Sequence, residues 1–153
     1  MARHASISPE EAADRLAIRE LIEAYAHCAD RRDAKGQMAL FIPDSHFVVY
    51  MNARDPKPSQ ELHSREELAE VFAGLNRYTA TMHLLGQTTI LTLANDRGTA
   101  ETYCMPHHYI SGKIRSLMIA ALRYTDTFVK MDGNWLFAER KLYVDWLEQR
   151  ELS

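Results

Sequence analysis

Asp30 and His83 are the two residues of this sequence whose types and settings best suit proton transfer. Asp30 ends a predicted helix at the edge of its apolar stripe, where a carboxylate needs a partner or carries a desolvation cost. His83 stands among apolar residues in TATMHLLG, and imidazole titrates near neutral pH. A histidine oriented by a carboxylate can act as a general base. The alternatives are a solvated Asp30 beside its neighbouring arginines and a hydrogen-bonded core histidine.

Tyrosines and further histidines supply additional candidates, since the chain holds seven of each. Tyr25 lies in the apolar stripe of the first predicted helix and Tyr50 ends the segment HFVVYM, although both could be core residues. His107 and His108 end a predicted strand, and because side chains alternate across a strand only one of them faces a given side. The other histidines have no evident partner and are expected to be structural or exposed: His4, His27, His46 and His63.

Other kinds of site lack support in the sequence. Cys28 and Cys104 form neither a CxxC pair nor a disulfide framework, and the simplest interpretation is two small buried residues. Because no HxH or HExxH spacing occurs, we expect no metal. No GxGxxG, GxxxxGK[ST] or GxSxG is present, so we also expect no nucleotide cofactor and no hydrolase nucleophile elbow.

Length and charge narrow the class of protein. A chain of 153 residues with 46% hydrophobic and 25% charged residues fits one globular domain, taken as residues 1–153. The net charge is −3 and no basic cluster exceeds two residues, which disfavours nucleic-acid binding. The apolar runs are far shorter than the ~20 residues of a membrane helix, and the first residues lack a signal-peptide pattern. We therefore expect a soluble cytoplasmic protein without a membrane partner.

The first half of the chain predicts mainly helices. Ser8 and Glu11 form a capping box with Pro9 at the first position, opening a helix of about 22 residues. A short helical segment around residues 34–41 should end at Pro43. Residues 46–51 suit a strand, and residues 52–63 a loop that could cover an opening. Ser64 and Glu67 form a second capping box before another helix.

The second half predicts a strand meander. Four long strands run from Met82 to Leu147, separated by turn signals at residues 95–98, 111–113 and 131–134. Helices followed by strands indicate an α+β fold, in which a curved antiparallel sheet wraps against the N-terminal helices and leaves a cavity. The outer sheet face is too apolar for full exposure, so we expect a homo-oligomer, either a dimer or a trimer.

Several segments together resemble the SnoaL-like branch of the nuclear transport factor 2-like superfamily. They are YAHCAD, VVYM, TATMHLLG, MPHH and MDGNWLFAERKLYVDW, and they cover nearly the whole chain in order. The pattern is most similar to scytalone dehydratase, hexachlorocyclohexane dehydrochlorinase and bile-acid 7α-dehydratase. The resemblance implies a cone-shaped α+β barrel with a pocket between helices and sheet.

The same resemblance assigns catalytic roles by position. Asp30 matches the helix-end carboxylate of these enzymes and His83 their base. Tyr50 matches one of two scytalone dehydratase tyrosines, but the other falls at Ala29. Tyr25, one turn earlier, matches the tyrosine of the bile-acid enzyme.

Further positions differ from the scytalone dehydratase pattern. His107 falls on its second histidine, and is counted as catalytic. The asparagine of scytalone dehydratase has no counterpart here, because the corresponding region contains Arg123 and Tyr124. This difference argues against scytalone itself as the substrate. The residues expected to contact the substrate are Cys104, His108, Arg123 and Tyr124.

The sequence thus predicts a cofactor-independent lyase of the dehydratase or dehydrohalogenase type. Its substrate would be a small cyclic molecule bearing hydroxyl or carbonyl groups, which the sequence does not identify. An isomerase is an alternative, and Arg123 with Asp126 keeps an epoxide hydrolase open. The alternative of another class is a ligand-binding or assembly subunit without catalysis, such as the small subunit of a ring-hydroxylating dioxygenase.

Overall fold

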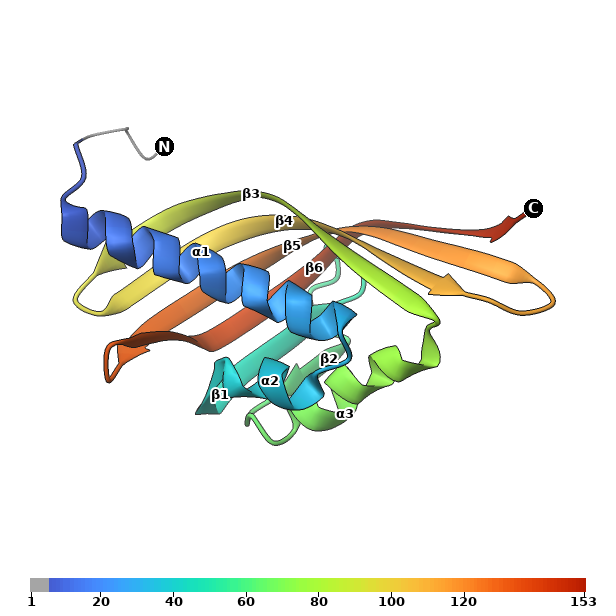
Figure 1. Ribbon diagram of the computed structural model, residues 1–153, viewed down its shortest axis with the longest axis horizontal. Coiled ribbons are helices and arrows are strands. Elements are labelled where there is room, and N and C mark those ends of the chain that lie inside the picture. Colours follow the sequence, from blue (N-terminus) through green and yellow to red (C-terminus); the bar gives the residue numbers. More distant parts are fainter. Residues whose placement is uncertain (1–5) are drawn as a thin grey trace.

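Helices cover one face of a curved, open, six-stranded sheet in the computed structural model, which describes residues 6–153 (Figure 1). His4 lies outside the described residues. The α+β class is confirmed, but the sheet is mixed, because β1 runs parallel to β6 while its other pairs are antiparallel. The strand order is β2-β1-β6-β5-β4-β3. The elements are α1 (Pro9–Asp30), α2 (Ala34–Ala39), β1 (Phe41–Tyr50), β2 (Gln60–Leu62), α3 (Leu68–Ala73), the 3-10 helix η1 (Gly74–Arg77), β3 (Ala80–Ala94), β4 (Arg97–Ile110), β5 (Arg115–Met131) and β6 (Asn134–Leu152).

The first helix has the predicted start and length. Ser8 Oγ accepts a hydrogen bond from the Glu11 backbone N–H at 3.1 Å, and Pro9 occupies the first turn. The apolar stripe packs on the sheet and brings Tyr25 into the core and Asp30 to the edge of β3. Across residues 6–153, no helix is both long and apolar enough to span a bilayer.

The four predicted meander strands are present as β3 to β6. Asn95 and Asp96 have φ angles of 53° and 57°, and Asp132 and Gly133 of 50° and 80°. Two successive positive φ angles are the requirement of type I′ turns, whose twist matches that of antiparallel strands. The turn chemistry therefore accounts for two of the three connections.

The region around Pro43 differs from the prediction. The short helix ends at Ala39, and the following strand already begins at Phe41 instead of His46. Pro43 lies where the pairing of β1 with β6 is interrupted, between Phe41 and His46. Since proline has no N–H to donate, it is tolerated at such an irregular point of a strand.

The predicted covering loop contains a strand that the sequence did not indicate. β2 has only three residues, too few to show periodicity, and pairs with β1. Ser64 Oγ accepts a hydrogen bond from Glu67 N at 3.3 Å, and Glu67 Oε2 accepts one from His63 N at 2.8 Å. The capping contacts thus exist, although the α-helix proper begins only at Leu68.

The sheet face opposite the helices carries exposed apolar side chains. Its large members, 39% to 56% exposed, include Met82, Leu84, Tyr103, Met105 and Trp146. Contact with another subunit would remove this surface from water. The homo-oligomer stays a prediction.

Candidate active site

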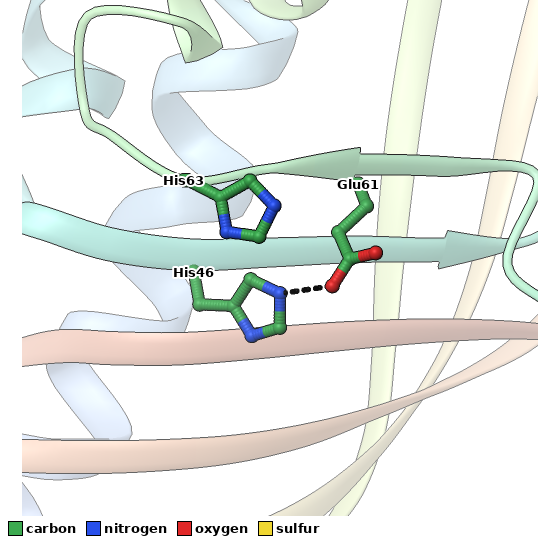
Figure 2. A group of neighbouring side chains, drawn as sticks. All are labelled: His46, Glu61 and His63. Carbon is green, nitrogen blue, oxygen red and sulfur yellow. Dashed lines mark hydrogen bonds and ion pairs between the residues drawn. The ribbon is translucent and has the colours of Figure 1, made fainter.

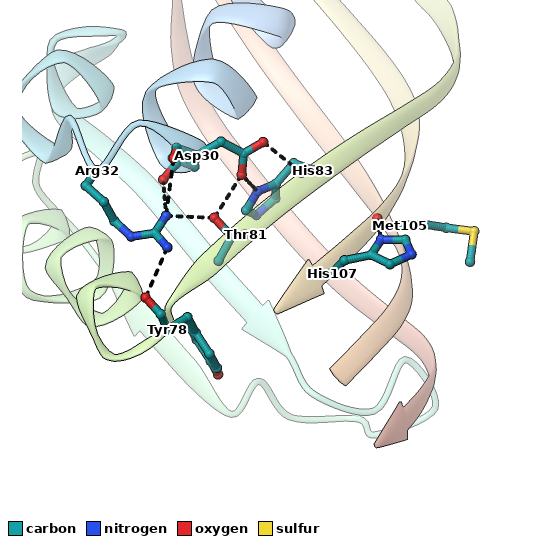
Figure 3. A network of polar contacts seen from close by, with 8 residues as sticks. Asp30, Arg32, Tyr78, Thr81, His83, Met105 and His107 are labelled. Carbon is teal, nitrogen blue, oxygen red and sulfur yellow. Dashed lines mark hydrogen bonds and ion pairs between the residues drawn. The ribbon is translucent and has the colours of Figure 1, made fainter. Parts of the chain in front are cut away.

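The end of α1 and the start of β3 bring Asp30 and His83 into direct contact (Figure 3). The Nδ1 atom of His83 lies 2.7 Å from Oδ1 of Asp30. The backbone N–H of His83 donates to Oδ2 of the same carboxylate at 2.9 Å. Two contacts to one carboxylate fix the imidazole ring relative to the helix end.

Thr81 and Arg32 complete the surroundings of this carboxylate, and of the two the sequence did not indicate Thr81. Thr81 Oγ1 donates to Asp30 Oδ1 at 2.9 Å and accepts from Arg32 Nη1 at 2.7 Å. Thr81 and His83 are two residues apart on one strand, so they share a face, and a Thr-x-His pattern could have indicated the contact. Partial burial raises the pKa of Asp30, but the hydrogen bonds from His83 and Thr81 outweigh it, and the net pKa lies below the usual value.

A cavity of about 500 Å³ opens beside His83, between α1, α3 and the sheet. Cavities of this size suit small organic ligands. The lining is mainly apolar, and its members include Phe47, Val71, Phe72, Met118, Leu122 and Val144. The titratable lining residues are Tyr25, Glu70, Arg77, Tyr78, His83, His108 and Tyr124.

His108, and not His107, faces the cavity. Both ring nitrogens of His108 are buried without a hydrogen-bond partner among the described residues, and the ring packs 4.4 Å from that of Tyr78. Burial, followed by the charges of His83 and Arg77, lowers the pKa of His108 to about 4. The imidazole is therefore neutral near pH 7 and offers a ligand one donor and one acceptor.

His107 and Tyr50, predicted to be catalytic, lie away from the cavity. His107 Nδ1 donates instead to the Met105 carbonyl oxygen at 2.9 Å (Figure 3). Phe47 and Val49 line the cavity, so alternation along β1 turns Tyr50 to the opposite face. There its ring stacks on Tyr143 at 4.7 Å. The structure thus places both of these predicted catalytic residues outside the lining of the cavity beside His83.

Of the remaining predicted contact residues, Tyr124 lines the cavity and two do not. Arg123 lies on the outer face, where it donates two hydrogen bonds to Asp145, each of 2.8 Å. Cys104 is buried in the core, and this burial raises the pKa of its thiol to about 12. These two positions are corrections to the predicted binding set.

Tyr25 and Tyr124 both line the cavity and sit on a buried ion pair. Arg140 donates to both carboxylate oxygens of Asp126 at 2.8 Å, and its guanidinium lies 4.1 Å and 3.9 Å from the two tyrosine ring centres. Burial raises the pKa of both phenols. The two hydroxyl groups therefore stay protonated and remain able to donate hydrogen bonds.

Comparison with known proteins decides the family. A family model described as a SnoaL-like domain matches residues 10–141. The chain belongs to the SnoaL-like family. An uncharacterized protein of Mycobacterium tuberculosis is similar in sequence, with 24% identity over 139 residues, which are 88% of this chain and 87% of the relative.

Solved structures support the fold of this SnoaL-like protein. A candidate scytalone dehydratase of Novosphingobium aromaticivorans has a TM-score of 0.80 at 21% identity, covering 94% of this chain and 91% of that one. The hexachlorocyclohexane dehydrochlorinase LinA-type3 of Novosphingobium barchaimii has a TM-score of 0.76 at 14% identity, covering 94% of this chain and 92% of that one. The beta subunit of a candidate aromatic-ring-hydroxylating dioxygenase of N. aromaticivorans has a TM-score of 0.74 at 22% identity, covering 90% of this chain and 93% of that one. At such identities the likeness concerns the fold and not an activity.

The neutral, buried His108 should make the stability of this SnoaL-like domain depend on pH. Its pKa is about 4 in the folded protein against 6.5 for the unfolded chain, so between these values the unfolded state binds more protons. The free energy of unfolding should consequently fall as the pH drops from 6.5 towards 4. Urea denaturation of wild type and His108→Gln across this range tests the effect, because the variant should lose part of the slope.

A matched control for this experiment is His107→Gln, which removes a neighbouring imidazole outside the cavity. This variant should follow the wild-type pH dependence. Identical slopes for wild type and His108→Gln would contradict the neutral buried state of His108.

Proposed function

We propose that this protein is a cofactor-independent lyase that eliminates water or halide from a small molecule. The observation that carries the proposal is the 2.7 Å contact between Asp30 and His83 at the wall of an apolar cavity. A carboxylate on Nδ1 holds the proton there and leaves Nε2 as the basic nitrogen. The names of two structural neighbours, a dehydratase and a dehydrochlorinase, agree with this chemistry.

The proposed reaction begins with proton removal. Nε2 of His83 takes an acidic proton from a carbon next to a carbonyl group, and the imidazolium that forms is stabilised by ionised Asp30. The C–H electron pair becomes a carbon–carbon double bond while the bond to the leaving group breaks. Departing hydroxide takes up the proton from His83 and leaves as water. Departing halide leaves as an anion, and His83 then releases its proton to solvent.

Stabilisation of the substrate oxygen would fall to the neutral donors of the cavity. Tyr25 and Tyr124 are protonated phenols, and His108 can donate through one ring nitrogen. Hydrogen bonds directed at an oxygen where negative charge develops are a major source of rate enhancement. Apolar walls favour a substrate with a hydrocarbon ring over a strongly charged one.

The second candidate is a subunit that binds or assembles without catalysis. The similarity to a dioxygenase beta subunit favours it. Such a subunit has no use for a basic His83 nitrogen, so proton exchange with a ligand separates the two functions.

Exchange with heavy water tests the lyase directly. The full chain is incubated in D₂O with a panel of cyclic ketones, with and without a β-hydroxyl or β-halogen group. We expect NMR to detect deuterium incorporation at the carbon next to the carbonyl group. Where the ketone carries a leaving group, we also expect the absorbance of the enone product to increase. His107→Ala should behave as wild type, because His107 faces away from the cavity. Ligand binding without exchange or elimination would favour the subunit.

A further inference from the structure

Two histidines and two glutamates gather on the sheet face opposite the cavity. His46 of β1 is directly paired with Glu139 of β6. On its other side Phe47 pairs with Leu62 and Val48 with Glu61, so the same register sets His63 beside His46. Because paired residues share a face, all four side chains point to one side of the sheet.

Three of these residues place ligand atoms close together (Figure 2). His46 Nε2 lies 2.7 Å from Glu61 Oε1, and the rings of His46 and His63 stack with centres 5.0 Å apart. One ligand atom from each residue lies within 4.8 Å of the other two. In tetrahedral zinc sites with ligand bonds of about 2.0–2.2 Å, ligand atoms are about 3.2–3.6 Å apart. Small side-chain rotations would therefore reach this geometry.

Glu139 supplies a feature typical of metal-binding histidines. Its Oε2 lies 2.7 Å from His46 Nδ1, while Lys141 Nζ lies 3.2 Å from its other oxygen. A carboxylate on one imidazole nitrogen orients the ring and directs the other nitrogen at the ion. The nitrogen so directed is Nε2, which faces Glu61.

We propose that His46, Glu61 and His63 bind a divalent transition-metal ion of the zinc type, with Glu139 orienting His46. The mixture of imidazole and carboxylate suits zinc better than calcium or magnesium, which prefer oxygen ligands. Three protein ligands leave a fourth position for water. The proposal does not depend on the lyase, since the site lies across the sheet from His83.

An ion held by these residues would join β1 to the three-residue edge strand β2, because His46 lies on β1 and Glu61 on β2. β2 leads into α3, whose residues line the cavity wall.

Titration calorimetry of the full chain with Zn²⁺, after removal of metals by a chelator, tests the proposal. We expect one equivalent bound and a rise in the melting temperature. His46→Ala and His63→Ala should abolish this binding. Glu139→Gln should weaken it about 10–100-fold, the usual effect of losing an orienting carboxylate.

The control variant is His107→Ala, which removes an imidazole from β4 and should leave Zn²⁺ binding unchanged. Excess Mg²⁺ should not compete. The proposal is overturned if the wild type binds no stoichiometric Zn²⁺, or if His46→Ala and His63→Ala bind it as the wild type does. In either case the cluster is a group of hydrogen-bonded surface side chains that does not bind the ion.

Discussion

Asp30→Asn should lower kcat by about 10²–10⁴-fold on any substrate that the enzyme turns over, with the fold retained. The carboxylate lies within hydrogen-bond distance of three potential donors, namely the His83 backbone N–H, the Thr81 hydroxyl and His83 Nδ1. An asparagine has one oxygen and one NH₂ group, so it cannot accept at both oxygen positions. If its NH₂ faces Nδ1, the imidazole proton moves to Nε2, and the nitrogen nearest the cavity loses its basic lone pair.

His83→Ala removes the proposed base itself and should reduce turnover at least as strongly. The double variant with Asp30→Asn should be little slower than His83→Ala alone, because residues that act as a unit have non-additive effects. Steady-state rates of the three variants, with the urea midpoint of each as the measure of folding, check the prediction. His107→Ala is the matched control. A folded His83→Ala enzyme that kept the wild-type rate would remove His83 from the mechanism.

The Asp30–His83 contact could be predicted because each residue follows a strong local signal. The apolar stripe of α1 has a clear helical period and a capped start, which places Asp30 at its end. The change to strand patterning then places His83 near the start of β3. The contact joins two elements that periodic patterns predict well. Arg32 lies in a turn and Thr81 at the start of a strand, and no periodic sequence pattern indicates the polar contacts made there.

The errors at Tyr50 and His107 concern the face of a strand. β1 contains Phe47, Val48 and Val49 in succession, and a continuous apolar run carries no alternation from which a face can be assigned. A shift of one residue turns a side chain to the other side of the sheet. The neighbouring residues therefore occupy the predicted places, Val49 and Met51 beside Tyr50, and His108 beside His107.

The His46 cluster illustrates a different limit. Its members lie at positions 46, 61, 63 and 139, and only the pairing of β1 with both β2 and β6 brings them together. The spacing of Glu61 and His63 alone would place both on one strand face. Nothing local indicates that this face meets His46, because the order of strands in a sheet depends on long-range contacts.

The ion pair below the cavity should control stability more strongly than any other polar contact described above. The side chains of Arg140 and Asp126 are 0% exposed, and two hydrogen bonds of 2.8 Å join them. Asp126→Ala would leave the guanidinium buried without its counter-ion, beneath Tyr25 and Tyr124. Removing one partner of a buried pair costs about 3–5 kcal/mol of unfolding free energy. Urea denaturation at neutral pH should reveal this loss.

Replacing both Arg140 and Asp126 distinguishes the effect of an unpaired buried charge from the effect of lost side-chain volume. Arg140→Met combined with Asp126→Leu keeps apolar bulk in the core and leaves no unpaired charge, so it should regain most of the stability lost by Asp126→Ala. The double variant still removes the cation beneath the two tyrosine rings, worth about 2 kcal/mol or more for a desolvated contact. Ligand affinity in the cavity should then change while the fold persists. If Asp126→Ala cost less than about 1 kcal/mol, as exposed pairs do, water would have to reach Arg140 in the folded protein.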